Sequence, residues 1–175
     1  MGQDFLKRQL EMTRFERALE ISESMAQHRA LLTTAELARL NNTLNGKKPD
    51  YESWRKGQVT ITLPSGKTET LALLSDPKLT AREKLHQATE LAENGHVIDA
   101  AVYLYTELVL SHPFEDANRR TAVLAAHYFL KRYGVPVSGV ALHEIGLGDI
   151  RDPKQLDSLK QTISQMAEHA KKLES

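Results

Sequence analysis

The feature that most constrains the fold is the segment from residue 97 to 134, where two helical patterns flank a short break. The run 97–111 is strongly apolar and predicts a buried helix. It ends at His112, because Pro113 cannot continue a helix and disfavours helical geometry at the residue before it. A helical pattern then resumes at Asn118 and ends near Gly134. The segment therefore predicts a central helix, a short loop and a second helix.

The loop between these helices has the composition of an anion site. The start of a helix presents unpaired backbone N–H groups and the positive end of the helix dipole, so it binds phosphate well. Here it is accompanied by a small residue, an amide and two guanidinium groups, which are Ala117, Asn118, Arg119 and Arg120. His112, at the other end of the loop, has an imidazole that could accept a proton from a hydroxyl group near neutral pH. The pattern predicts a phosphate site beside a general base.

Residues 112–120 read His-Pro-Phe-Glu-Asp-Ala-Asn-Arg-Arg. This string resembles the core motif of the Fic/Doc family, H-P-F-x-[D/E]-[G/A]-N-[G/K]-R, at eight of nine positions, and Arg119 is the exception. The resemblance implies an enzyme that uses ATP or another nucleoside triphosphate to modify a Ser, Thr or Tyr hydroxyl of a target protein. It gives His112 the role of base, Asp116 that of Mg²⁺ ligand and Arg120 that of contact to a terminal phosphate.

Some of these residues also have a structural interpretation. Asp116 could instead cap the following helix by accepting from the amides near Asn118 and Arg119. Phe114 is interpreted as a core anchor, and Asn118 as a side-chain donor to phosphate. The alternative for the whole string is a surface loop with a helix cap.

Two departures from the family pattern bear on the reaction. Members that transfer AMP carry glycine where Arg119 stands and a second arginine where Val123 stands. The stretch 117–122, Ala-Asn-Arg-Arg-Thr-Ala, is closer to the Doc pattern A-N-K-R-T-A, which implies transfer of the terminal phosphoryl group. We therefore expect phosphoryl transfer slightly ahead of AMP transfer, with a non-catalytic Fic binding module as a further alternative. The Doc likeness also makes an antitoxin a candidate partner.

The rest of the chain predicts a mostly α fold: a Fic-like helical core with one β-hairpin flap and extra N- and C-terminal helices. The expected boundaries are an N-terminal helical extension at 1–29, a Fic-like domain at 30–150 and a C-terminal helix at 151–175 on the same domain. Further helices are expected at about 4–30, 33–44, 80–93 and 153–173, with capping boxes at Thr33–Glu36 and Thr80–Glu83. Alternating residues predict the hairpin at 59–73.

Two segments outside the loop have regulatory or binding interpretations. The hairpin 59–73 is either a ribbon that covers the core or an edge that binds a target segment by β-augmentation. The family's inhibitory pattern, [S/T]-x-x-x-E-[G/N], is matched at 89–94 and all but matched at 164–169. With Val123 in place of the arginine, neither has its usual partner.

Composition excludes several functional classes. The 175 residues include 23 Lys plus Arg and 23 Asp plus Glu, so a general nucleic-acid or anionic-membrane binder is not expected. No apolar run approaches the roughly 20 residues of a membrane span. Cysteine is absent, which excludes disulfides and thiolate chemistry. Since the first residues also lack a secretory pattern, a cytoplasmic location is expected.

Overall fold

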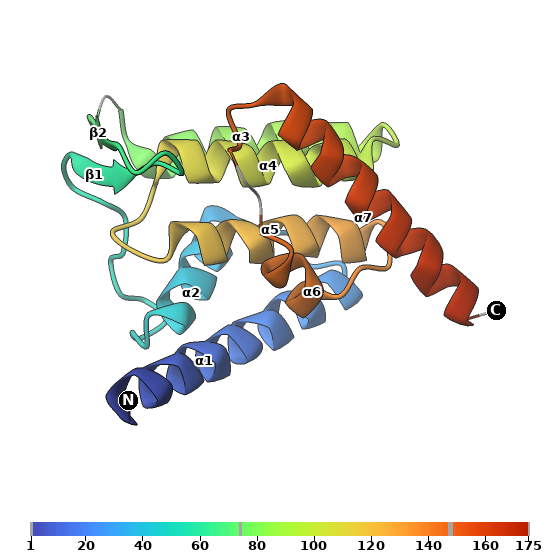
Figure 1. Ribbon diagram of the computed structural model, residues 1–175, viewed down its shortest axis with the longest axis horizontal. Coiled ribbons are helices and arrows are strands. Elements are labelled where there is room, and N and C mark those ends of the chain that lie inside the picture. The colour runs from blue at the N-terminus through green and yellow to red at the C-terminus, as the bar shows by residue number, and fades with distance from the viewer. Residues whose placement is uncertain (1, 74, 147–148, 175) are drawn as a thin grey trace.

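The structure is a computed structural model that describes residues 2–73, 75–146 and 149–174. These residues form seven helices and one antiparallel hairpin (Figure 1), which confirms the mostly α fold expected from the sequence. The elements in chain order are α1 (Gly2–Gln27), α2 (Thr34–Leu44), β1 (Val59–Thr62), β2 (Thr68–Leu71), α3 (Pro77–Glu93), α4 (Val97–Ser111), α5 (Asn118–Arg132), α6 (Gly139–Glu144) and α7 (Pro153–Glu174).

Helix α5 is the centre of the core. It packs against α4, α1, α2 and α6, and eleven of its 15 residues are buried. Its alanines Ala122, Ala125 and Ala126 present small side chains that let neighbouring helices approach closely. The first turn of α5 is therefore held on several sides, which fixes the end of the loop that precedes it.

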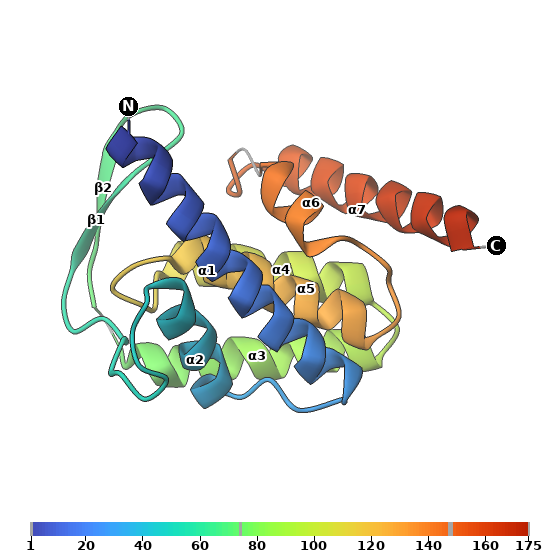
Figure 2. The same ribbon diagram turned by 90° about the horizontal axis from the view of Figure 1, so that it is seen from below.

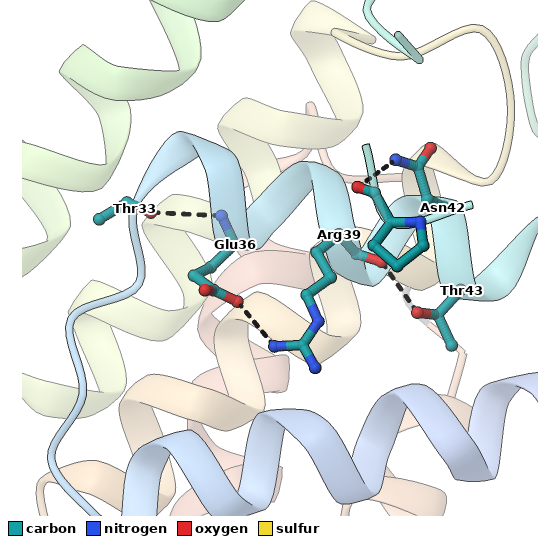
Figure 3. A network of polar contacts seen from close by, with 6 residues as sticks. Thr33, Glu36, Arg39, Asn42 and Thr43 are labelled. Carbon is teal, nitrogen blue, oxygen red and sulfur yellow. Dashed lines mark hydrogen bonds and ion pairs between the residues drawn. The ribbon is translucent and has the colours of Figure 1, made fainter. Parts of the chain in front are cut away.

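Helix α2 begins at the predicted cap. The Thr33 hydroxyl accepts a hydrogen bond from the Glu36 N–H at 3.2 Å, as Figure 3 shows. The Glu36 carboxylate pairs with Arg39 at 3.3 Å instead of returning to the Thr33 N–H, which donates to Leu31. Only one half of the capping box is formed, and it is sufficient to start the helix.

The prediction for the start of α3 was wrong by about one turn. The helix begins at Pro77, and Asp76 caps it by accepting from the Lys78 N–H at 2.9 Å. Thr80, the expected cap, instead donates its hydroxyl to the Asp76 carbonyl from within the first turn. An aspartate followed by proline is a strong start signal because proline at the first helical position loses no hydrogen bond.

Helix α1 is confirmed, but only its second half contributes to the core. Phe5, Leu6 and Leu10, in the expected apolar stripe, are 60%, 63% and 49% exposed, whereas Phe15 and Leu19 are buried. The first turns of α1 project beyond the other helices in both views (Figures 1 and 2). The stripe thus predicted a helix correctly and overestimated how much of it is covered.

The hairpin lies at the same end of the molecule as the α4–α5 loop (Figure 1). Its register pairs Val59 with Leu71 and Ile61 with Glu69, and these four residues form its less exposed face. Arg151, just before α7, forms a two-pronged ion pair with Glu69, with contacts of 2.6 and 2.9 Å. This ion pair connects the segment before α7 to strand β2 of the hairpin.

Candidate active site

The α4–α5 loop begins and ends on residues with left-handed backbone geometry. His112 is the C-cap of α4 with φ 49°, and Ala117 is the N-cap of α5 with φ 58°. Non-glycine residues seldom adopt this conformation because Cβ approaches the backbone, so both positions hold local strain. Two such reversals turn the chain sharply from α4 into α5. Backbone strain of this kind is concentrated at functional sites.

His112 is oriented with one ring nitrogen engaged. Its Nδ1 lies 3.1 Å from the Val109 carbonyl oxygen, which can only accept. Nδ1 must therefore carry the hydrogen in this contact, and Nε2 of the neutral ring carries the lone pair. The side chain is partly exposed. A half-exposed imidazole whose Nε2 has no hydrogen-bond partner among the described residues has the form required of a general base.

Asn118 shapes the loop through its side chain. Its Oδ1 accepts from the Phe114 N–H at 2.9 Å, and its Nδ2 donates to the Phe114 carbonyl at 3.0 Å. The residue is only 4% exposed, and Phe114 is fully buried as expected for an anchor. The side-chain oxygen and one of the two Nδ2 hydrogens are thus used within the loop, and the expected contact to phosphate stays a prediction. What Asn118 presents at the helix start is its backbone N–H.

The first turn of α5 has no side-chain cap. Ala117 cannot supply one, and the first amide with an intrahelical acceptor is that of Thr121. Within the described contacts, the N–H groups of Asn118, Arg119 and Arg120 have no acceptor. Three unpaired donors at the positive end of a helix form an anion site.

Asp116 does not cap α5, so its expected structural interpretation was wrong. Its Oδ1 accepts from the adjacent Ala117 N–H at 2.7 Å, and its side chain is exposed. No group of three or more His, Cys, Asp or Glu side chains among the described residues could hold a metal by itself. A lone exposed carboxylate fits Mg²⁺ that arrives with a nucleotide, since this ion commonly takes one or two carboxylates and completes its shell with phosphate and water oxygens.

The two arginines of the motif point to different neighbours. Arg119 donates its Nε–H to the buried Tyr105 hydroxyl on α4 at 3.0 Å. Arg120 is half-buried and lies near His143 on α6. Burial is the main cause that lowers the pKa of His143, and Arg120 and then Arg119 lower it further. The helix start therefore carries a concentration of positive charge, with Arg119 held toward α4.

Val123, where the family pattern has a second arginine, is a core residue. It is 2% exposed and lines a small apolar cavity with Tyr105, Leu142, Leu159 and Ile163. Leu142 comes from α6, and Leu159 and Ile163 come from α7. The C-terminal helix thus contributes to the apolar surroundings of the position at which the family pattern has its second arginine.

Two residues that position the loop were not identified from the sequence. Arg55 donates to the carbonyls of Ser111 and His112 at 3.2 and 2.6 Å. Asn41, on α2, donates to the Asp116 carbonyl at 2.7 Å and to the Thr121 hydroxyl at 3.0 Å. Consecutive asparagines inside a predicted helix, 41–42, were a usable signal, because asparagine is a poor helix former unless its side chain has a task.

Neither candidate inhibitory helix reaches the loop. Glu93 is the last residue of α3, beside the start of α4, whereas His112 follows the end of α4, about 22 Å away for a 15-residue helix. On α7, Lys160 pairs with Asp99 in the first turn of α4 at 3.0 Å. Glu168 lies two turns further along α7 toward its C-terminal end, and that end of the helix lies at the end of the molecule opposite the α4–α5 loop (Figure 1).

The helical fold, the hairpin and the loop that begins at His112 and leads into an uncapped helix are the features expected of the Fic/Doc class. A profile of the Fic/DOC family matches residues 19–130, and the chain belongs to this family. It is 52% identical over 42 residues to a uridine 5′-monophosphate transferase of Xanthomonas campestris pv. campestris (strain 8004). That match covers 24% of this chain and 8% of the relative.

Solved structures share the fold. A Fic-domain-containing signaling protein from Bacteroides thetaiotaomicron VPI-5482 matches with a TM-score of 0.68 at 21% identity, covering 93% of this chain and 69% of that one. A Fic family protein from Desulfovibrio desulfuricans G20 matches with a TM-score of 0.60 at 14% identity, covering 94% and 55%. No described helix is long and apolar enough to span a bilayer.

Proposed function

We propose that this Fic-domain chain is a transferase that moves a phosphate-containing group from a nucleoside triphosphate to a Ser, Thr or Tyr hydroxyl of a target protein. The observation that carries the proposal is the pairing of His112, whose Nε2 has no partner among the described residues, with the uncapped first turn of α5. One supplies a base and the other a phosphate site at opposite ends of the six-residue loop from His112 to Ala117.

In the proposed reaction, His112 Nε2 takes the proton as the hydroxyl oxygen forms a bond to phosphorus. For phosphoryl transfer, the bond from the γ phosphorus to the nucleoside diphosphate breaks, and for nucleotide transfer, the bond from the α phosphorus to pyrophosphate breaks. The electron pair of that bond leaves with the departing group. The amides at the start of α5 and the Arg120 guanidinium hold the phosphates and offset their charge. Asp116 would hold Mg²⁺, which supplies neutralisation of phosphate charge when bound.

The group transferred has two candidates. Arg119 and Val123 support transfer of the terminal phosphoryl group. Val123 is buried in apolar surroundings and offers no cation to a triphosphate tail, while Arg119 adds a charge on the α4 side. The name of the Xanthomonas relative supports transfer of a nucleoside monophosphate instead. Since the 42-residue match is short, we propose phosphoryl transfer first and nucleotide transfer second.

The target would dock on the hairpin. Each of its two strands has four residues and an unpaired outer edge in the described structure, which suits pairing with an extended segment. The hairpin lies at the same end of the molecule as the α4–α5 loop (Figure 1), which begins at His112, so a segment bound there would bring a hydroxyl to the base.

The test is labelling of protein in a cell lysate by this chain with ATP or UTP carrying label at the α or the γ phosphate. We expect label on protein with the wild type and at least about a hundredfold less with His112→Ala, because a general base contributes roughly that much. Label from the γ position supports phosphoryl transfer, and label from the α position supports nucleotide transfer. Equal labelling by wild type and His112→Ala would exclude His112 as the base, and nucleotide binding without labelling would make the chain a binding module.

A further inference from the structure

Arg55 is a buried guanidinium that has only backbone carbonyls as partners within the described contacts. It is 7% exposed, and no ion pair with a described carboxylate is formed. Burial lowers its pKa, although arginine remains charged in proteins. A buried cation is costly unless its donors are satisfied, so the position of each N–H matters.

The five N–H donors of Arg55 meet five carbonyl oxygens from three segments. Nε donates to His112 at 2.6 Å, and Nη2 donates to Ser111 at 3.2 Å. Toward the hairpin, Nη1 donates to Gly57 at 2.8 Å and to Leu71 at 3.3 Å, and Nη2 donates to Ala72 at 3.4 Å. One planar group therefore joins the end of α4 to both ends of the hairpin.

The backbone around Arg55 reinforces the same connection. Its N–H donates to the Pro113 carbonyl at 3.0 Å, and the Glu115 N–H donates to the Ser53 carbonyl at 3.1 Å. Between these two bonds, the Trp54 ring stacks on Phe114 with centroids 4.5 Å apart. The segment before the hairpin thus runs antiparallel to the α4–α5 loop and is bound to it.

His112 is held at three points. Arg55 binds its carbonyl oxygen, its backbone N–H donates to the Leu108 carbonyl at 3.1 Å, and the Val109 carbonyl accepts from its Nδ1–H. Its left-handed backbone, φ 49°, is a conformation that a histidine leaves readily unless neighbouring contacts fix it. A movement of the hairpin base would move the same guanidinium that fixes the His112 carbonyl.

We propose that Arg55 is a positioning residue that transmits the position of the hairpin to the His112 ring. A target segment that docks on the hairpin thereby also sets the direction of Nε2. This inference rests on the proposed function for its consequence in catalysis. The connection that Arg55 makes between the hairpin and the His112 imidazole does not depend on any reaction.

The first test is Arg55→Lys, which retains the charge but not the planar array of five donors. The probe is the ring NMR signal of His112 in histidine-labelled protein, assigned by its loss in His112→Ala. We expect wild type to show one Nδ1–H tautomer and Arg55→Lys to show a mixture.

With labelled nucleotide, we expect kcat of Arg55→Lys to fall by about ten- to a hundredfold, as for misplaced catalytic groups, while KM for the nucleotide changes less than twofold. Arg132→Lys, at the far end of α5 with its guanidinium over Tyr133, is the matched control.

The second test leaves Arg55 intact and changes the hairpin from its other side. Arg151→Ala removes the ion pair with Glu69 at an exposed site, so folding should be preserved. We expect faster amide exchange in the hairpin together with a shifted His112 ring signal. Lys131→Ala, which removes the exposed ion pair with Glu23, should leave that signal unchanged. Loosening of the hairpin with an unchanged His112 signal in either variant would overturn the inference, whereas a shifted signal in a protein without transfer would fail only the proposed function.

Discussion

At the scale of single residues, the α4–α5 loop contains strained backbone at Ala117, and this strain accompanies the sharp turn of the chain into α5. Ala117 has φ 58° and is 8% exposed, so its backbone is strained and its Cβ is enclosed. This conformation costs an alanine roughly 1–2 kcal/mol relative to glycine. It also leaves the helix start without a side-chain cap, which is what exposes the amides that follow. The strain and the anion site therefore have one origin.

The left-handed backbone of Ala117 predicts opposite effects on the free energy of unfolding for two substitutions at this position. Ala117→Gly should raise the free energy of unfolding by up to about 1 kcal/mol, since glycine adopts positive φ freely. Ala117→Val should lower it by about 2 kcal/mol or more, because a β-branched side chain is strained at positive φ and has little room. Urea unfolding followed by circular dichroism measures both. A valine variant as stable as wild type would contradict the left-handed geometry.

At the scale of elements, α2 supports the α4–α5 loop through two asparagines. Asn41 is fully buried and reaches Asp116 and Thr121 across the helix interface. Asn42, also buried, donates to the carbonyls of Pro49 and Tyr51 and so anchors the chain that leads to Arg55. Figure 3 shows the Asn42 amide near the C-terminal end of this helix, bonded to a carbonyl of the segment that follows it. One short helix thus fixes the loop end and the approach to the hairpin.

Asn41→Ala should therefore affect both stability and transfer. Removing the amide leaves the Asp116 carbonyl without this partner, and an unsatisfied buried group costs about 1–3 kcal/mol. We expect the free energy of unfolding to fall by about that amount and transfer to fall with it, because Asp116 loses its support. Thr43→Ala is the control, since the Thr43 hydroxyl bonds only to Arg39 of its own helix. If Asn41→Ala lowered stability no more than Thr43→Ala, the contact to Asp116 would be unimportant.

At the scale of the whole molecule, short-range patterns predicted the elements and long-range contacts determined what they do. Helix α4 was predicted at its observed bounds because proline and an apolar run are local signals. Helix α6, six residues long with a Ser138 cap, was not predicted because it is too short to show a period. The role of Arg55 could not be read from sequence, since its partners lie 56 and 57 residues away at Ser111 and His112.

The sequence predicted which residues lie in the candidate site but not all of their side-chain contacts. His112 and Asp116 were identified from the motif, and the structure places both in the α4–α5 loop, while their roles as base and Mg²⁺ ligand stay predictions. Asn118 was expected to contact phosphate, but its side chain binds Phe114 four residues earlier. Residue type alone does not say whether an amide faces a ligand or its own backbone. That choice depends on the loop conformation, which two left-handed residues set.

The far end of α5 carries a buried titratable group that should govern stability toward acid. His127 is 3% exposed and its Nε2–H donates to the Val137 carbonyl at 2.8 Å, while its Nδ1 has no partner among the described residues. Burial lowers its pKa, and the bond to Val137 opposes this only in part. In the unfolded chain the pKa is about 6.5. Below that pH the unfolded state therefore binds a proton that the folded state does not.

The free energy of unfolding should consequently fall as pH decreases below about 6.5, by up to about 1.4 kcal/mol per pH unit for this one group. His127→Gln should reduce the slope by that amount, because glutamine can donate to Val137 without titrating. The pKa of His143 is also lowered, so a part of the dependence of the free energy of unfolding on pH should remain in the His127→Gln variant. Urea unfolding between pH 7.5 and 5 measures this, with His86→Gln on the exposed face of α3 as the control. Equal slopes for wild type and His127→Gln would mean that the imidazole takes up its proton without unfolding, through a partner that the buried Nδ1 gains at low pH.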